Sequence, residues 1–376
     1  MLWFQRFRCA HEPTRRFFAP ASWSPLPRAH KGVVHGSPCA TFATAVDVKN
    51  PPPRYSGLAT FFRAPFVDMH GDAAALRTVD IGLVGVPYDG GVTSRPGARH
   101  GPREVRSQSA TNVRRVNQAS GCQPFDMDLH VADVGDAYVS RPFELVQAHS
   151  EIQAHFAQLL DAGVVPVTLG GDHSISLPIL RAFGEARRRA GKPPLAMVHV
   201  DAHADTGDDY MGSKFHHGAP FKIAVDEGLI DPKCTVQLGI RGSTGFPNQW
   251  AFSYNSGMRV IDVDECADLG YQGVLAEIAR VVGDKDTYVT FDIDALDPAY
   301  APGTGTPEIG GLTTHFAQRL LRGLGPGGLN LPIVGVDLVE VAPPLDVGNV
   351  TSLTGANIMF ELLCIVAQSL HSRRSA

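Results

Sequence analysis

The sequence predicts an α/β fold in which helices cover both faces of a parallel sheet. From Val79 onward, apolar runs of strand length alternate with segments of helical period. The runs are rich in Val, Ile and Leu, as is typical of strands that are buried on both faces. The segments expected to be strands are 79–86, 164–169, 195–200, 235–240, 259–263, 288–293 and 333–339.

The helical segments are identified by apolar residues that recur with the period of an amphipathic helix. In the segment 314–324, for example, Phe316, Leu320, Leu321 and Leu324 fall on one face. The segments expected to be helices are 144–162, 176–190, 274–282, 314–324 and 359–371. With 376 residues, of which 44% are apolar, the chain is long enough to bury a sizeable core.

Composition narrows the range of partners and compartments. The net charge is -5 with both signs dispersed, so no basic surface is expected and nucleic acid is not a predicted partner. The six cysteines are scattered without a CxxC pair, which favours reduced thiols and argues against secretion. No apolar run was found that approaches the roughly 18 to 20 residues of a membrane span, so no membrane association is expected.

The N-terminus differs in character from the rest of the chain. Residues 1–45 contain six basic residues and a single acidic one, Glu12, with aromatic residues between them. That composition is typical of a mitochondrial presequence and predicts import into the matrix; the alternative is a basic tail without targeting meaning. We expect residues 46–78, which include three consecutive prolines at 51–53, to be a linker or extension, and residues 79–376 to form one catalytic domain.

Acidic and imidazole side chains gather where the predicted strands end. Ligands of open parallel sheets bind beyond the carboxyl ends of the strands, and alternate residues of a strand end project to the same side. We therefore treat these residues as one set of candidate metal ligands: His173, Asp201, His203, Asp205, Asp292 and Asp294. Each alone has a simpler interpretation, because a single Asp-x-Asp is usually a loop or cap and a single His is usually a core residue.

The charge balance of this set indicates metal ions. Four carboxylates in one cleft would repel one another and raise one another's pKa values, whereas two divalent cations would neutralise them. Carboxylate and imidazole ligands suit hard to borderline metals, so two Mn²⁺ ions per chain are expected, with zinc, cobalt or iron as alternatives. Two such ions roughly 3.5–4 Å apart can share a water and turn it into a hydroxide nucleophile.

The predicted chemistry is hydrolysis of a guanidino group. A guanidinium is a poor electrophile, but its positive charge would draw it into an acidic cleft. Glu340, beyond the run 334–339, could pair with its free nitrogens and hold its carbon over a metal-bridged hydroxide. The leaving amine needs a proton, and His217 is the candidate for that transfer, although the neighbouring His216 leaves the choice open.

Three segments closely resemble the signature motifs of the ureohydrolase family of arginases and agmatinases. They are Gly-Gly-Asp-His-Ser at 170–174, Asp-Ala-His-Ala-Asp at 201–205 and Phe-Asp-Ile-Asp-Ala-Leu-Asp-Pro at 291–298. The resemblance implies a three-layer α/β/α sandwich with a mainly parallel eight-stranded sheet, assembled as trimers or hexamers. It also implies that Asp201 and Asp292 bridge two manganese ions.

The same resemblance assigns the residues that act on the substrate. Glu340 would bind the guanidinium, His217 would bind substrate and transfer the proton, and Thr306, in the segment 301–307, would contact the substrate. The segments 85–89 and 93–102 resemble agmatinases and guanidino acid hydrolases. Arginases carry an Asn two residues after the position of Asp205, and this chain has Gly207 there.

The expected substrate is therefore agmatine, cut to urea and putrescine. The alternative is a linear guanidino acid such as 4-guanidinobutanoate, cut to urea and 4-aminobutanoate. Agmatine ends in an ammonium and the acid in a carboxylate, so the choice depends on residues further from the metals. The candidates for that contact carry both signs of charge: Asp208, Asp209, Lys214, Arg95 and Arg99.

Two other classes of protein could share this fold. A deacetylase with a single zinc could share the fold, but one zinc needs only about three protein ligands and this chain offers six. A non-catalytic relative would keep the fold without the chemistry, yet every expected ligand is present, together with Glu340 and His217. The sequence thus favours a hydrolase acting on the C–N bond of a linear amidine.

Overall fold

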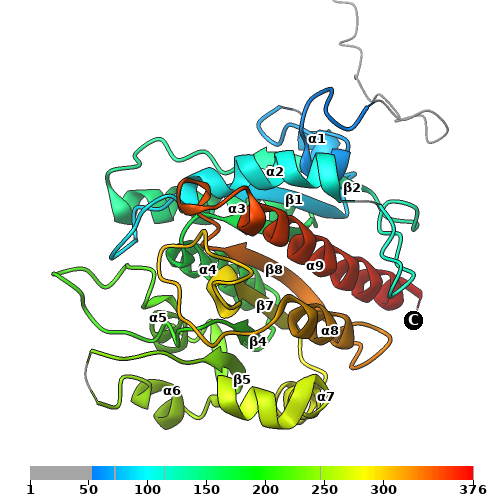
Figure 1. Cartoon of the computed structure of the whole chain (residues 1–376). Helices are drawn as coiled ribbons and strands as arrows, with labels where there is room; N and C mark the ends of the chain where they lie inside the picture. The colour runs from blue at the N-terminus through cyan, green and yellow to red at the C-terminus, as the bar shows by residue number, and fades with distance from the viewer. Residues whose placement is uncertain (1–52, 72, 114, 246, 376) are drawn as a thin grey trace, which may run out of the picture. The chain divides into compact units, whose positions relative to one another are not determined.

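The structure is a computed structural model that describes residues 53–375 except 72, 114 and 246 (Figure 1). The predicted presequence, 1–45, and the first part of the predicted linker, 46–52, lie outside the described residues.

Eight parallel strands form one sheet in the order β2-β1-β3-β8-β7-β4-β5-β6. Their bounds are β1 Ile81–Val86, β2 Val131–Asp136, β3 Val165–Gly170, β4 Leu195–Val200, β5 Ile230–Ile240, β6 Arg259–Asp262, β7 Thr287–Asp292 and β8 Ile333–Val339. All seven strands expected from the sequence are present, and the expected eight-stranded parallel sheet is confirmed. Strand β2 was missed because Asp133, Gly135 and Asp136 interrupt its apolar pattern at the edge of the sheet.

Nine α-helices are found among the described residues. Their bounds are α1 Ala73–Leu76, α2 Gly101–Asn112, α3 Leu145–Asp161, α4 Ser176–Arg189, α5 Pro220–Asp226, α6 Ala251–Ser256, α7 Val263–Val282, α8 Thr314–Leu324 and α9 Val350–Ser375. The predictions for 274–282 and 359–371 were too short, since these helices begin at Val263 and Val350. Helix α2 was not predicted because most of its residues are polar and only one side is buried.

The helices lie in two layers, one on each face of the sheet (Figure 1). Helices α2, α7, α8 and α9 pack on the face that carries Val198 and Val200 of β4. Helices α3, α4 and α5 pack on the opposite face, to which β4 contributes Leu195 and Met197. The alternation of a strand divides the core in this way, and it confirms the three-layer sandwich.

Helix α9 corrects the expectation that no run is long and apolar enough to span a membrane. By length and composition it qualifies, with a mean hydropathy of 1.7 over its most apolar window. However, 78% of that window is buried inside the protein. Helix α9 packs against β8, α2 and α8, so its apolar character is explained by a central position in the core.

Part of the predicted linker is anchored to the folded body. Phe61 and Phe62 are buried in the core, and their backbone amides donate to Asp133 Oδ2 (2.9 Å) and Ser109 Oγ (3.0 Å). The backbone of Val67 also donates to the carbonyl of Asp133 (2.9 Å). This segment therefore covers α2 and the β2 edge of the sheet.

Candidate metal centre

The four central strands β3, β8, β7 and β4 are neighbours, and their carboxyl ends deliver the predicted side chains to one place. Asp201 follows β4, Asp292 closes β7, His173 follows β3, and Glu340 follows β8. Parallel strands all end at the same edge of a sheet, so residues from four distant segments converge.

The turn after β3 requires glycine at position 171 to place His173. A Cβ on Gly171 would lie 1.7 Å from the backbone oxygen of Tyr88, so only glycine fits there. Asp172 then caps the short helix that begins at His173, since its side chain accepts from the amide of Ser174 (2.9 Å). The imidazole of His173 is thereby directed towards the ends of β4 and β7.

Three carboxylates converge on one ring nitrogen of His173. Its Nδ1 lies 3.0 Å from Asp201 Oδ2, 3.0 Å from Asp205 Oδ2 and 3.2 Å from Asp292 Oδ2. A single nitrogen can satisfy one such oxygen, not three. In octahedral coordination with bonds of about 2.1 Å, neighbouring ligand atoms lie about 3.0 Å apart. Each of the three oxygens thus lies about as far from Nδ1 as neighbouring ligand atoms lie from one another around one cation.

A second group of ligand atoms shares Asp201 with the first. His203 Nδ1 lies 3.2 Å from Asp294 Oδ2 and 3.5 Å from Asp201 Oδ1. The two oxygens of Asp201 therefore face different imidazoles, as a bridging carboxylate would. The side chain of His203 is 33% exposed, whereas Asp201 and Asp294 are buried, so the second group lies nearer to solvent.

Burial and mutual repulsion strongly perturb these acids. Burial, together with the charges of Asp294 and Asp201, raises the pKa of Asp292 well above its usual value. Burial likewise raises the pKa of Asp294. For His173 and His203, burial favours the neutral ring, but the surrounding carboxylates outweigh it and raise both pKa values well above normal.

None of these carboxylates pairs with a lysine or arginine among the residues described. The described ion pairs of Asp201, Asp205, Asp292 and Asp294 are with histidines only. Arg241 lies close by, but its guanidinium donates to backbone carbonyls, including that of Asp294 (2.7 Å). Among the described residues, the acids of this site thus have histidines but no lysine or arginine as ion-pair partners, and the donor set suits hard or borderline divalent metals.

Glu340 and His217 form a buried pair beside the candidate ligands. His217 Nδ1 lies 2.9 Å from Glu340 Oε1, which also accepts from the backbone amide of His173 (2.9 Å). The other oxygen, Oε2, is buried and has no hydrogen-bond partner. An orphaned buried carboxylate oxygen is costly, so it is suited to a donor that arrives with a ligand.

The charge of Glu340 acts on His217. Burial lowers the pKa of His217, but the adjacent Glu340 carboxylate raises it to about 9. The backbone amide of Thr93 favours the neutral ring, because it can donate to Nε2 of His217 (3.1 Å) only when that nitrogen carries no proton. The pKa of His217 is nevertheless raised, since its contact with the Glu340 carboxylate (2.9 Å) is shorter than the contact with the Thr93 amide and involves a full charge.

The structure brings His217, and not His216, to Glu340. The ring of His216 is tied into its own loop, with Nε2 2.8 Å from the carbonyl of Asp208 and Nδ1 accepting from the amide of Gly218 (3.2 Å). Thr306 lies at the same edge, where its hydroxyl donates to Asp294 Oδ2 (3.3 Å).

Two of these residues have unusual backbones. Asp205 and Glu340 have φ angles of 49° and 64°, in the left-handed region that non-glycine residues rarely occupy. Such conformations cluster at ligand-binding sites, where the surrounding structure holds them.

The charged residues considered for the far end of the substrate are largely engaged elsewhere. Asp208 lies 3.4 Å from Lys222, and Asp209 accepts from the amide of Gly212 (2.8 Å). Arg99 pairs with Asp89. Arg95 donates to the carbonyls of Thr304 and Gly305, both at 2.9 Å, and Lys214 is exposed.

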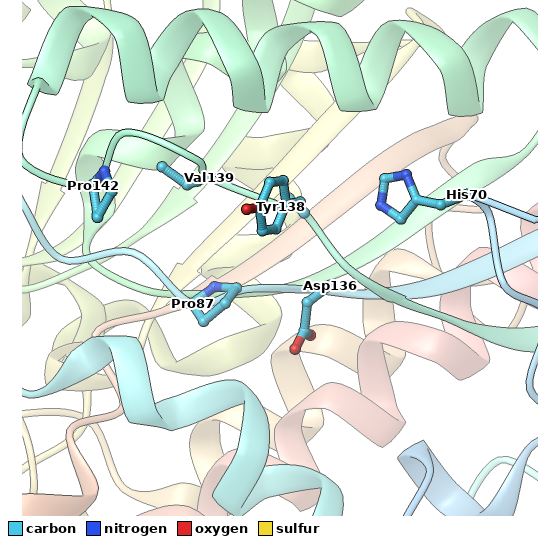
Figure 2. A pocket seen from close by; sticks show the side chains of 7 residues that line it. His70, Pro87, Asp136, Tyr138, Val139 and Pro142 are labelled. Carbon is cyan, nitrogen blue, oxygen red and sulfur yellow. The ribbon is translucent and has the colours of Figure 1, made fainter. Parts of the chain in front are cut away.

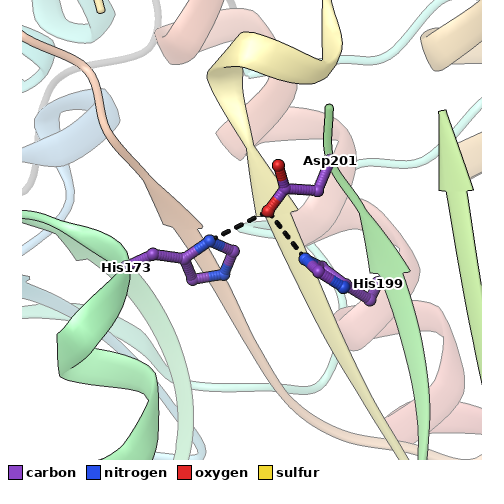
Figure 3. Close-up of side chains that lie close together, drawn as sticks. All are labelled: His173, His199 and Asp201. Carbon is purple, nitrogen blue, oxygen red and sulfur yellow. Dashed lines mark hydrogen bonds and ion pairs between the residues drawn. The ribbon is translucent and has the colours of Figure 1, made fainter. Parts of the chain in front are cut away.

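Sequence reasoning missed His199. This fully buried residue of β4 lies 2.7 Å from Asp201 through its Nε2, and Figure 3 shows it opposite His173 on the same carboxylate. His173, His199 and Asp201 form one of two groups whose ligand atoms are close enough to hold a metal; Asp201, His203 and Asp294 form the other. The i, i+2 spacing that selected Asp201 and His203 also connects His199 with Asp201 and could have found it.

The chain is thus an α/β protein whose buried histidine–carboxylate cluster, at the carboxyl edge of a parallel sheet, could hold metal ions. Residues 79–364 match the Arginase family, and the chain belongs to it. It is therefore a ureohydrolase acting on guanidino compounds, which disfavours the single-zinc deacetylase.

Named relatives support this class of enzyme. The chain is 51% identical over 318 residues to guanidinopropionase of Pseudomonas aeruginosa, a match that covers 84% of this chain and 94% of the relative. It is 48% identical over 288 residues to the mitochondrial agmatinase of Gallus gallus, covering 77% and 81%. Among solved structures, the proclavaminate amidino hydrolase of Streptomyces clavuligerus superposes with a TM-score of 0.76 at 40% identity, covering 84% and 99%.

Proposed function

We propose that the protein is a binuclear manganese ureohydrolase that cuts urea from a linear guanidino compound. The observation that carries this proposal is the convergence of Asp201, Asp205 and Asp292 on Nδ1 of His173, with the other oxygen of Asp201 facing His203. This pattern supports two ions bridged by Asp201, and Asp292 is the second proposed bridge.

The proposed ligands form two overlapping sets. One Mn²⁺ would be held by His173, Asp201, Asp205 and Asp292, and the other by Asp201, His203, Asp292 and Asp294. When bound, the two ions would supply a water molecule made nucleophilic at neutral pH. The burial of the site supports this role, because a low-dielectric environment strengthens each charge interaction.

Glu340 is the proposed guanidinium acceptor. A guanidinium donates charge-assisted hydrogen bonds to a carboxylate, and Oε2 of Glu340 is buried with no partner of its own, whereas Oε1 already contacts His173 and His217. Gly305 leaves room beside it, since a Cβ there would lie 3.7 Å from Oε2. Such pairing lies in the plane of the guanidinium, so it would orient the central carbon and leave its faces open to a nucleophile.

His217 is the proposed proton donor to the leaving amine. Its raised pKa, about 9, means that it carries a proton at neutral pH, and its contact with Glu340 sets it beside the proposed guanidinium position. Thr306, next to Asp294, is the further proposed substrate contact.

Two substrate classes remain in the proposal. Agmatine, giving putrescine, is supported by likeness to the Gallus gallus agmatinase, and a guanidino acid such as 4-guanidinobutanoate by likeness to guanidinopropionase. The test is a urea-release screen of manganese-loaded protein against agmatine, arginine and guanidino acids of graded length. Release from agmatine or one of the acids, with little from arginine, is expected; release from none of them would refute the proposed function.

We further propose that residues 1–45 direct the protein to the mitochondrial matrix and that 79–376 is the catalytic domain. The relative from Gallus gallus is named as mitochondrial. A chain without residues 1–45 should hydrolyse substrate normally but stay outside mitochondria in fractionated cells. Normal import of the truncated chain would contradict the targeting role.

Assembly into trimers or hexamers is part of the proposal. Light scattering after size-exclusion chromatography would check it, and a monomer would refute it.

A further inference from the structure

We propose that His199, Gln237 and Thr290 form a buried support for the candidate metal centre, which positions Asp201 and His173. This inference rests on the proposed metal site. It concerns residues outside the proposed ligand sets, which lie beneath those ligands within the sheet, and it assigns His199 the role of a support and not of a ligand.

The support belongs to one row across the sheet. Gln237 of β5 pairs in register with His199 of β4, His199 with Thr290 of β7, Thr290 with Asp337 of β8, and Asp337 with Thr168 of β3. Paired residues of neighbouring strands project to the same face, so all five side chains point towards α4 and α5. Each is fully buried. Burying five polar side chains in a sheet that is covered on both faces costs free energy unless they form hydrogen bonds.

The proton of His199 is fixed by Gln237. The amide nitrogen of Gln237 lies 2.6 Å from the carbonyl oxygen of Ala204 and 3.0 Å from Nδ1 of His199. The reverse amide orientation would set two oxygens 2.6 Å apart, so the nitrogen must face Ala204 and donate to both groups. Nδ1 of His199 is therefore an acceptor, and its proton lies on Nε2.

That proton points at the candidate bridging ligand. Nε2 of His199 donates to Asp201 Oδ2 at 2.7 Å, the same oxygen that lies 3.0 Å from His173 Nδ1 (Figure 3). The ring of Phe221 packs against His199 at a centroid distance of 4.4 Å and limits its rotation. Asp201 is thus held in one rotamer by a donor whose own orientation is fixed.

Thr290 does the same for His173. Its hydroxyl oxygen lies 2.8 Å from Nε2 of His173, the nitrogen that faces away from the carboxylates. If Nε2 donates its hydrogen to Thr290, Nδ1 keeps its lone pair for a cation. Metal-binding histidines are usually oriented in this way, and the loss of such partners costs about 10- to 100-fold in metal affinity.

The row also contains its own control. Thr168 is as buried as Thr290, but its hydroxyl has no hydrogen-bond partner and touches no candidate ligand. Thr290→Val and Thr168→Val are therefore the same change of shape and polarity in the same row. Both keep a β-branched residue in a strand, so both proteins should fold.

The test is a titration of Mn²⁺ into chelator-treated full-length protein, with free Mn²⁺ measured by electron paramagnetic resonance. Thr290→Val and His199→Phe should weaken Mn²⁺ binding about 10- to 100-fold, whereas Thr168→Val should bind like the wild type. Thr290→Ser, which keeps the hydroxyl, should restore most of the affinity.

Equal affinity in Thr290→Val and Thr168→Val would overturn the inference, as would a wild-type chain that binds no Mn²⁺. A wild-type chain that binds no Mn²⁺ would refute both proposals, whereas the other outcomes refute them separately. Wild-type protein that binds Mn²⁺ but releases no urea would refute the proposed function alone. Unchanged affinities in an active enzyme would refute the support alone.

Discussion

Two places at the carboxyl edge of the sheet can be compared. One is a cavity of about 490 Å³ beside β1 and β2, which we call the outer cavity (Figure 2). It is lined by His70, Pro87, Asp136, Ala137, Tyr138, Val139 and Pro142. The other is the candidate metal centre at the ends of β3, β8, β7 and β4. Acidic side chains lie at both places, but among the described residues only those of the metal centre have no lysine or arginine as an ion-pair partner.

The acids near the outer cavity are compensated within the fold. Arg106 pairs with Asp133 at 2.9 Å and with Asp136 at 2.5 Å. Burial opposes the charge of Arg106, but the two carboxylates outweigh it and raise its pKa. At the metal centre, the acids face only histidines and one another. The comparison teaches that uncompensated, convergent charge indicates chemistry better than the size of an opening does.

The largest expected difference in activity between the two places comes from removing one carboxylate charge at each of them in turn. Asp292→Asn should abolish metal pairing and lower urea release by about 10³-fold or more, because the ions supply several kcal/mol of stabilisation. Asp136→Asn should change activity by no more than about twofold, as surface substitutions usually do. Metal content and urea release should be measured on both; full activity in metal-loaded Asp292→Asn would break the comparison.

His217→Ala should have the next largest effect. Turnover should fall by about 10²- to 10³-fold while the manganese content stays unchanged, since His217 is proposed to move a proton and not to bind metal. His216→Ala is the matched control, and it should lose much less activity because its ring contacts only its own loop. A larger loss in His216→Ala would reverse the assignment.

Arg106→Leu tests the compensated acids. It should reduce the free energy of unfolding by about 2–3 kcal/mol, because it leaves the buried Asp133 carboxylate without its cation, although the backbone amides of Phe61 and Gly135 still donate to it. Arg141→Leu removes an exposed pair and should change stability by about 0.5 kcal/mol or less. Denaturant unfolding of both would measure this. Comparable losses would mean that the Arg106 pairs do not stabilise the fold.

The smallest predicted effect is on pH dependence. Because the pKa of His217 rises on folding from its usual 6.5 to about 9, the pair with Glu340 stabilises the metal-free protein fully below pH 6.5. That contribution should be lost as the pH rises through 9. The melting temperature of the wild type should exceed that of His217→Asn by a few degrees at pH 6, and the gap should close by pH 10. A constant gap would exclude the charge interaction.

The sequence predicted most of the fold because its signals are local. Seven strands and the buried face of α8 follow from the spacing of apolar residues within a few positions. Where polar residues break that spacing, as in β2 and α2, the prediction failed. Those elements are stabilised by contacts with distant segments, such as the pairs of Arg106 with β2.

The candidate ligands could likewise be chosen from the sequence by itself, since Asp201, His203 and Asp205 occupy alternate positions directly after an apolar run. The predicted alternation along a strand end is wrong, because β4 ends at Val200 and the chain bends before Asp205. Only the tertiary structure decided that His217 and not His216 meets Glu340, and that His199 contacts both Gln237 and Asp201. His199 and Gln237 are 38 residues apart and meet because β4 and β5 are neighbours in the sheet. Spacing along one strand is a local property of the chain, whereas strand order results from the packing of the whole domain.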